Sequence, residues 1–550
     1  MLGLDWSIWA VLVLYFAGML LLGWWSKRLA STQEGYLLGE RKFGSFMMVM
    51  HSFGAGTNPG DAAGVVSGTV STGASGIWAS WMWLFGTPFY WLIAPIVRRM
   101  RCLTLAEYFE ERFGRAASAL YVLVATFGMA VCLASVLLAT AGTAQGMMGK
   151  ATGPNSEAWF YGIIIVCTIT FLVYGYWGGI VAAIRTDMPQ GLMIILLSFL
   201  AVPAALAMPE VGGLSGMREA LGSIADTNYL SLFDKTDFKW GVVVLLCIKA
   251  PLTALALPHL ISVCGAGRSE WEGRMGFTGG NLLKRICTIG WAILGLSWLA
   301  YVMSSGQPVE PDAAFGDAIR HLLPPVLQGV MLACVMGAAM SSGDAFQVTV
   351  AGLFSRNIYR PYVKPMAEDK HLVKVTKVTG IIFVVLSLII AVLVRDIVGA
   401  IMAYFNILAL VGISTAMGIL WRRMNQAGVF CSVLLASITF VLTRVIPGIS
   451  AEAATGLPIL VGVIAGIVGS LATPPPSRRR VEKFFTKIYV PVGQEEKLNQ
   501  SLDEVVPEDE RLCTAGGLFL VKPRLQSWLG FVIVLGICVA CVAFMAFLLA

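Results

Sequence analysis

Two apolar segments of this chain carry glycine and proline where a membrane-spanning helix needs unbroken hydrogen bonding. One runs from Ser52 to Asp61 (Ser-Phe-Gly-Ala-Gly-Thr-Asn-Pro-Gly-Asp), and the other holds Pro251 and Pro258 within an apolar run. Hydrocarbon offers no hydrogen-bond partners, so such breaks are tolerated only where the freed carbonyls line a cavity or hold an ion. Two breaks in corresponding positions of two halves are the best sequence indication of a secondary transporter's binding site.

The composition predicts an all-α polytopic membrane protein. Of 550 residues, 57% are hydrophobic and 13% are charged, whereas a soluble chain carries about 25% charged residues. Apolar stretches of about 20 residues, each long enough to cross a bilayer core, predict about fourteen transmembrane helices. These expected spans are 5–26, 45–69, 76–97, 117–147, 157–178, 181–208, 240–264, 278–304, 322–354, 373–395, 398–421, 427–445, 455–472 and 526–549.

Basic residues cluster after alternate spans, and this pattern predicts the topology. The clusters occupy 27–42, 98–101, 268–285, 356–374, 422–423 and 478–480, whereas the intervening loops are acidic or mixed. Because loops rich in lysine and arginine stay cytoplasmic, we expect a multi-pass protein with both termini outside. The expected location is the plasma membrane, or the bacterial inner membrane if the source is prokaryotic. Such short juxtamembrane clusters do not indicate a nucleic-acid partner. The first apolar run has no basic region before it, so we interpret it as a retained span.

The expected organisation is one transporter domain with a short appendage. The domain covers 1–472: a leading helix at 5–26, an inverted-repeat core at 45–421, and two further helices within 427–472. Spans two to six and seven to eleven form two sets of five, and an odd number of spans forces successive copies into opposite orientations. Residues 209–239 are expected to form a polar external loop with a short helix. Residues 473–525 form a cytoplasmic linker, either lying on the anionic inner leaflet or acting as a plain tether, before the final helix at 526–550.

Ionisable residues inside the expected spans are few, and each is a functional candidate because burying a charge in lipid is costly. They are Asp61, Asp187, Lys249 and Asp344, with His51 and His259 as weaker candidates. No Ser-His-Asp or paired-carboxylate arrangement with a soluble pocket is formed by these residues. The sequence therefore argues against an enzyme.

The ninth expected span predicts part of a cation site. Ser341, Ser342 and the carbonyl of Ala338 lie within one helical turn, so their oxygens can converge. A hard cation such as sodium prefers about five or six oxygen ligands, and the break at Gly56–Pro59 offers further carbonyls. In the alternative interpretation, the two serine hydroxyls simply bond back to the preceding turn of their own helix.

Other candidates have two interpretations each. Asp187 is either the partner of a neighbouring arginine or, with Asp344, a ligand of a second cation. Asp61 either faces a substrate cavity or caps the helix after the break. Lys249 either contacts a substrate anion or pairs with an aspartate. His259 either gates the site or is a satisfied core histidine.

At these residues the chain resembles the sodium:solute symporter family, which includes sugar, proline and pantothenate carriers. The resemblance covers most of residues 5–472. It rests on the broken second span, 174–179 (Tyr-Gly-Tyr-Trp-Gly-Gly), 186–190 (Thr-Asp-Met-Pro-Gln), 340–344 (Met-Ser-Ser-Gly-Asp) and 356–360 (Arg-Asn-Ile-Tyr-Arg). Pro258-His259 is similar to a motif of the proline and pantothenate branch, and the extra span near 526–549 to the sugar branch.

The resemblance implies a LeuT-type core of two inverted five-helix repeats and sodium-driven uptake. Carried over by position, the sodium ligands are the carbonyls of Gly56, Pro59 and Ala338 and the hydroxyls of Ser341 and Ser342. Asp187 matches a functionally sensitive acid of the family, and a second cation there would also involve Asp344. Sugar carriers place a polar amide where this chain has Leu257, which weakens a sugar assignment.

We therefore expect a sodium-coupled symporter that imports a small polar organic solute by alternating access, with a sugar or related compound favoured. The alternatives are a sodium- or proton-coupled symporter for an amino acid or carboxylate and, in another class, a transporter-like sensor or channel. Expected partners are the solute, the sodium ion and the lipid bilayer, with the chain a monomer or weak oligomer. The candidate solute contacts are Asp61, Ser80, His259, Tyr404 and Asn406.

Overall fold

The computed structural model of the chain describes residues 4–26, 41–150, 155–223, 228–234 and 238–550, with side chains for all of these except 20, 22–26 and 170–186. Helices make up nearly all of the regular structure. The described residues form one small sheet, the antiparallel pair β1 (Arg511–Cys513) and β2 (Leu520–Val521). The all-α prediction is confirmed for the part of the chain that the structure describes.

Within the described residues, nine helical segments are long and apolar enough to cross a bilayer. Five of them are single helices near the C-terminus: α18 (Asp369–Val394), α19 (Ile397–Leu420), α20 (Gln426–Val445), α21 (Ala451–Leu471) and α24 (Leu525–Leu549). The others are α8 (Arg115–Met147), residues Asp187–Leu206, Glu270–Ser305 with α15 (Gly280–Ser305), and Pro325–Val363 with α17 (Pro325–Phe354). Two further apolar helices are α1 (Trp6–Ser26), whose side chains are described for most of its length, and the shorter α12 (Trp240–Ala256). The expected count of fourteen is not confirmed.

Breaks in the backbone explain part of the lower count. The second expected span is divided into α3 (Ser45–Gly56) and α4 (Pro59–Thr72), and the seventh into α12 and α13 (Leu260–Gly265). The third expected span, 76–97, is wrong as a single helix. It consists of a 3-10 turn (Gly73–Ile77), α5 (Trp78–Trp81), a second 3-10 turn (Leu84–Gly86) and α6 (Thr87–Arg99).

A second correction concerns the expected spans 157–178 and 181–208. The structure has no break between them: α9 runs from Ser156 to Leu200, and the short α10 (Val202–Leu206) follows. The glycine pair at 178–179 lies within α9, because glycine is common inside membrane helices and does not by itself end one. Pro189 also lies inside α9.

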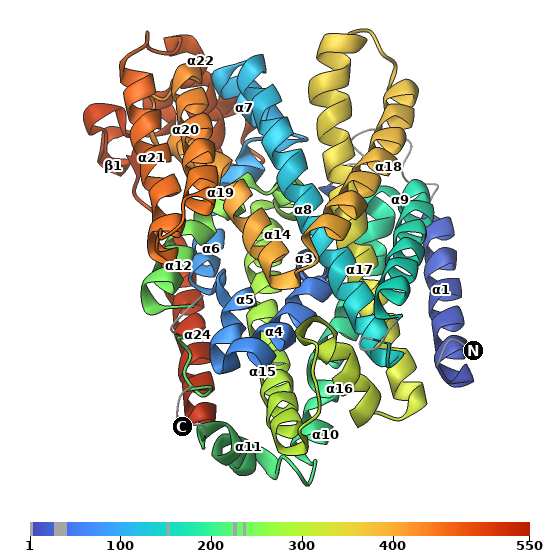
Figure 1. Ribbon diagram of the computed structural model, residues 1–550. Coiled ribbons are helices and arrows are strands. Elements are labelled where there is room, and N and C mark those ends of the chain that lie inside the picture. The colour runs from blue at the N-terminus through green and yellow to red at the C-terminus, as the bar shows by residue number, and fades with distance from the viewer. Residues whose placement is uncertain (1–3, 27–40, 151–154, 224–227, 235–237) are drawn as a thin grey trace.

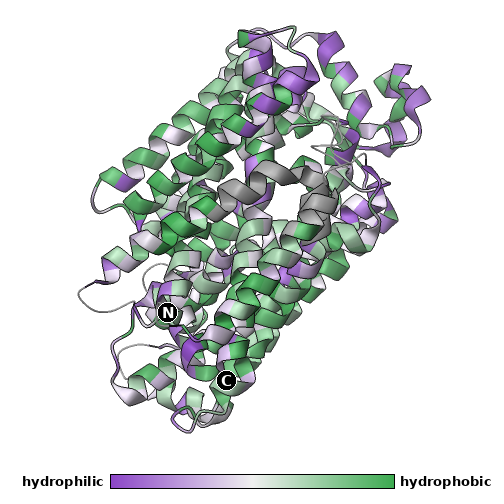
Figure 2. Ribbon diagram, turned by 90° about the vertical axis from the view of Figure 1, so that its right-hand side faces the viewer, coloured by the Kyte–Doolittle hydropathy of each residue, from purple (hydrophilic) through white to green (hydrophobic). Residues whose placement is uncertain are grey.

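The helices form one bundle in which α8 lies near the centre and α24 and α18 lie toward the periphery (Figure 1). Hydrophobic residues cover the sides of the bundle, and hydrophilic residues gather toward its ends (Figure 2). The N- and C-termini lie at the same end, together with the short helix α11 (Gly213–Gly222) that the sequence predicts in the loop at 209–239 (Figure 1).

Residues 473–525 lie at the opposite end of the bundle and fold onto it (Figure 1). Their main helix, α22 (Arg478–Tyr489), buries Val481, Phe484, Phe485 and Ile488 against the core. Next to it lies α7 (Leu105–Phe113), where the ring of Tyr108 meets that of Phe484 at 5.4 Å. The segment is therefore an ordered, packed unit of the described structure.

Candidate ion and solute site

The break between α3 and α4 is explained by the residues within it. Helix α3 ends at Gly56, Thr57 and Asn58 are extended, and Pro59 opens α4, where its missing N–H costs nothing. The Asn58 side chain accepts a hydrogen bond from Gly60 N (2.8 Å), and Asp61 Oδ2 accepts one from Asn58 N (3.0 Å). This reciprocal cap fixes the start of α4. The Gly54 carbonyl accepts from Thr57 N (3.3 Å), and the carbonyls of Ala55 and Gly56 after it are left without helical partners.

The serine pair of α17 reaches across to neighbouring helices. Ser342 Oγ lies 3.4 Å from the carbonyl oxygen of Gly54 and 3.3 Å from that of Ala55, both at the end of α3. Ser341 Oγ donates to Asp187 Oδ1 on α9. Neither hydroxyl is engaged by the preceding turn of α17 in these contacts, so the alternative of simple back-bonding does not describe them. Three helices that are distant in sequence meet at this point.

Asp187 is fully buried in this cluster. Its second carboxylate oxygen lies 2.6 Å from His51 Nδ1 on α3, and both side chains are excluded from solvent. Asp344 is buried on α17, and its Oδ1 has no hydrogen-bond partner among the described residues. The side chains of Arg185 and of the motif at 174–179 lie outside the described part.

A lysine that the sequence analysis missed lies at the break. Lys284 Nζ, on α15, lies 2.7 Å from Asp61 Oδ2 and 2.5 Å from the carbonyl oxygen of Gly56. Both partners of the ion pair are buried. Gly56 therefore offers its carbonyl to an ammonium, whereas Ser342 contacts the carbonyls of Gly54 and Ala55. Of the two earlier interpretations of Asp61, the capping one describes its contacts.

A small cavity opens beside the break, with a volume of about 50 Å³. That is room for a few water molecules, so the cavity has to widen to admit an organic solute. Its lining combines the break, the second break at Leu257–His259, aromatic rings and two cations: Ser52, Ala55, Gly56, Asn58, Trp83, Tyr90, Cys132, Leu257, His259, Val263, Phe277, Asn281, Lys284, Arg285, Phe346 and Tyr404.

The predicted solute contacts divide into two groups. His259 and Tyr404 line the cavity, and the His259 ring lies 5.4 Å from that of Phe346. Asp61, Ser80 and Asn406 do not line it. Ser80 Oγ lies 3.1 Å from Thr288 Oγ1, and Asn406 Oδ1 accepts a hydrogen bond from Lys249 Nζ at 2.5 Å. Lys249 therefore has an amide partner, where the sequence analysis considered a substrate anion or an aspartate.

Arg285 is the second cation that the sequence analysis missed. It is buried on α15, where Nη1 donates to the carbonyl of Ser80 (3.2 Å) and Nε to Thr87 Oγ1 (3.4 Å). No carboxylate forms an ion pair with it among the described residues. Residues 268–285 were expected to form one cytoplasmic cluster, but Lys284 and Arg285 lie inside a membrane helix. Both residues fall within the expected span 278–304, and this overlap could have identified them as intramembrane cations.

A family model described as the sodium:solute symporter family matches residues 36–436 of this chain. Two curated relatives cover most of both chains. The osmoregulated proline transporter OpuE of Bacillus subtilis is 23% identical over 489 residues, covering 86% of this chain and 96% of its own. The sodium/proline symporter of Haemophilus influenzae is 26% identical over 484 residues, covering 81% of this chain and 90% of its own.

One solved structure is similar across the bundle. A sodium-coupled sialic acid symporter, described in a substrate-bound outward-open state with a novel sodium site, matches with a TM-score of 0.71. It covers 86% of this chain and 99% of its own at 18% sequence identity. At that identity the likeness shows a shared fold, while substrate and ion sites have to be argued from the residues of this chain.

Proposed function

The chain belongs to the sodium:solute symporter family, and within that family we propose that it imports a small solute carrying a carboxylate. It is a membrane transporter coupled to sodium and not an enzyme. The sequence favoured a sugar as the solute. We propose instead the alternative of an amino acid or other carboxylate.

The positive charge of the cavity carries this proposal. Lys284 and Arg285 both line it, and Asp61 is the one carboxylate paired with either of them among the described residues. A neutral sugar would leave the second cation uncompensated in a low-dielectric site, which is costly. A carboxylate would compensate it, because the planar guanidinium matches carboxylate geometry. The relatives' names also point to carboxylates, since proline and sialic acid both carry one.

We place sodium between the end of α3 and the serine pair of α17. The proposed oxygen ligands are the carbonyls of Ala55 and Ala338 and the hydroxyls of Ser341 and Ser342. Ala55 is favoured over Gly56, because the Gly56 carbonyl already accepts from Lys284. Pro59 belongs to α4 beyond the extended residues, so its predicted role as a ligand has less support. Asp187 and Asp344 remain our candidates for a second cation.

Sodium binding and solute binding would be coupled because both involve the break between α3 and α4. Sodium would tie the end of α3 to α17, while the solute would occupy the cavity on the other side of the same residues. Each partner then stabilises the conformation that the other binds, which is the requirement for linked binding. One sodium ion moving down 100 mV contributes about 2.3 kcal/mol to uptake.

Orientation is part of the proposal. We place both termini outside the cell and the end of the bundle that carries α22 in the cytoplasm. The support is the arginine-rich sequence of that end, since basic loops are retained in the cytoplasm. Protease accessibility of the 473–525 segment in sealed right-side-out vesicles tests it: cleavage from outside would reverse the assignment.

Uptake into proteoliposomes tests the substrate class. A sodium gradient should drive accumulation of L-proline or another small carboxylate, whereas glucose should not accumulate. Arg285→Gln should raise the KM for the carboxylate solute more than about tenfold, the scale of a charge-assisted pair. Lys249→Gln is the matched control, because it removes another buried cation that does not line the cavity. Sodium-driven glucose uptake with no response to carboxylates would refute the proposal.

A further inference from the structure

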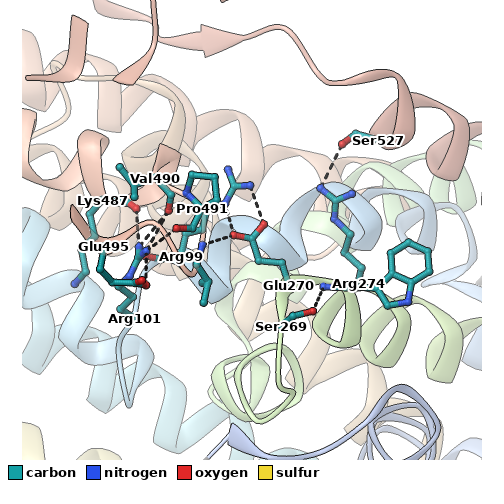
Figure 3. Close-up of polar contacts among 12 residues, drawn as sticks. Arg99, Arg101, Ser269, Glu270, Arg274, Lys487, Val490, Pro491, Glu495 and Ser527 are labelled. Atoms are coloured by element: carbon teal, nitrogen blue, oxygen red, sulfur yellow. Dashed lines mark hydrogen bonds and ion pairs between the residues drawn. The ribbon is translucent and has the colours of Figure 1, made fainter. Parts of the chain in front are cut away.

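The C-terminal end of helix α22, which carries partial negative charge, is contacted by a positively charged side chain. Arg101 donates from Nη1 to the carbonyl of Lys487 (3.1 Å) and from Nη2 to those of Val490 (3.3 Å) and Pro491 (3.1 Å) (Figure 3). It also pairs with Glu495 at 3.2 Å. Because the C-terminus of a helix carries partial negative charge, a guanidinium there is stabilising. Arg101 thus anchors this end of the segment to the bundle.

The N-terminal end of α22 is the opposite case. It opens with Arg478, Arg479 and Arg480, its first turn has no acidic residue, and the preceding Ser477 makes no side-chain cap. Arg478 pairs with Glu482 at 2.8 Å, but Arg479 and Arg480 have no ion pair among the described residues. Cations at a helix N-terminus are unfavourable because that end already carries partial positive charge. An anion would correct the mismatch.

A polar pocket of about 240 Å³ lies at this end. Its walls come from α7, the first turn of α20 and the start of α22, and include Arg112, Arg480, Asn425, Gln426 and Ser477. No aspartate or glutamate lines it. In α20 the side chain of Asn425 caps the N–H of Gly428 at 2.9 Å. The N–H groups of Gln426 and Ala427, which both line the pocket, have no acceptor within their own helix, so a second helix N-terminus adds positive potential to the same pocket.

Arg112 supplies the independent observation. Its side chain is fully buried, with Nε donating to the carbonyl of Gly418 (3.3 Å) and Nη2 to those of Trp421 and Arg422 (3.1 Å each). Its remaining nitrogen, Nη1, has no partner among the described residues. The acids next to it in sequence are engaged elsewhere, Glu110 by Arg115 and Glu111 by Lys487. Burial, and then the charges of Arg422 and Arg480, lower the pKa of Arg112 to about 10.

We infer that this pocket binds the phosphoryl group of an anionic ligand, held by Arg480, Arg112 and the N-termini of α20 and α22. Arginine groups and helix N-termini together are the usual elements of phosphate recognition in proteins. The ligand joins α22 to α7 and α20, so its binding fixes the 473–525 segment on the bundle. The phosphoryl group has two sources, the headgroup of a membrane lipid or a soluble phosphate compound.

Thermal unfolding of the purified full-length protein tests the site with inorganic phosphate as probe. Phosphate titrated in neutral detergent, against chloride at the same ionic strength, should raise the melting temperature saturably. Arg480→Gln should weaken the apparent phosphate affinity about tenfold. Arg479→Gln is the matched control, because it removes the same charge from the neighbouring position and does not line the pocket. Its affinity should stay within about twofold of the parent protein.

A second arm identifies the source. The same proteins are compared in nanodiscs of phosphatidylcholine alone and of phosphatidylcholine with phosphatidic acid, which presents a phosphate monoester. Stabilisation by phosphatidic acid that depends on Arg480, without a saturable response to inorganic phosphate, assigns the site to a lipid headgroup. The reverse assigns it to a soluble compound. If neither probe stabilises the protein, or if Arg479→Gln loses as much affinity as Arg480→Gln, the inference is wrong.

Discussion

The hydroxyl oxygen of Ser342 lies 3.3 Å from the carbonyl oxygen of Ala55, although the two residues are 287 positions apart in sequence. This contact joins α17 to the end of α3, where the backbone leaves its helix. Three oxygens, the hydroxyl of Ser342 and the carbonyls of Gly54 and Ala55, therefore lie close enough together to contact one ion. The proposed transport cycle depends on that convergence.

Alanine substitutions at Gly54 and at Gly56 should have different effects on sodium binding, although the two glycines lie in the same turn of α3. A Cβ added at Gly54 would lie 3.0 Å from Ser341 Oγ and 3.2 Å from Asp187 Cβ, whereas one added at Gly56 meets nothing within 4 Å. Gly54→Ala should displace the serine and weaken stabilisation by sodium about tenfold or more in apparent affinity. Gly56→Ala should leave it unchanged. Equal sodium responses of the two variants, measured by thermal unfolding, would contradict the placement.

The ion pair of Lys284 with Asp61 should behave as a buried unit. Lys284→Met leaves an unpaired carboxylate in the bundle, and removing one partner of such a pair costs about 3–5 kcal/mol. Adding Asp61→Asn removes the stranded charge and should restore much of the lost stability. A double-mutant cycle of unfolding measures this coupling. Additive effects of the two substitutions would show that the residues do not interact.

A pH effect is expected from Asp317, which lies in α16 (Ala314–Leu322) between two spanning segments. Burial raises its pKa from 3.8 to about 6, against the opposing charge of Arg320. The folded state therefore binds more protons than the unfolded state between about pH 4 and 6, and the free energy of unfolding falls as pH rises through that window. The difference in melting temperature between Asp317→Asn and the parent should be near zero below about pH 4 and should grow to a plateau above about pH 6. A difference in melting temperature that does not change with pH would show that Asp317 does not have a raised pKa in the folded state.

The breaks in the helices could be predicted because their causes are local. Proline removes a donor, and Asn58 with Asp61 forms a cap within four residues, so Gly56 to Pro59 shows its break in the sequence. The serine pair could be predicted as well, since Ser341 and Ser342 share one helical turn. Both features lie within a short stretch of chain.

The register of the carbonyls and the identity of the cavity cations could not be predicted in the same way. Which carbonyl faces Ser342 depends on how α3 is rotated against α17, and that rotation is set by packing among distant helices. Lys284 and Arg285 were assigned to a cytoplasmic cluster because their partners, Asp61 and Ser80, lie more than 200 positions away. Only the tertiary structure brings these pairs together.

The sodium dependence of thermal unfolding for Ser342→Ala tests the central claim most directly. Ser387→Ala is the matched control, because Ser387 is an equally buried serine whose hydroxyl bonds only within α18, to the carbonyl of Phe383 at 2.9 Å. Loss of one ligand should raise the sodium concentration for half-maximal stabilisation about tenfold in Ser342→Ala and leave it unchanged in Ser387→Ala. A sodium response in Ser342→Ala equal to that of the parent protein would contradict the account.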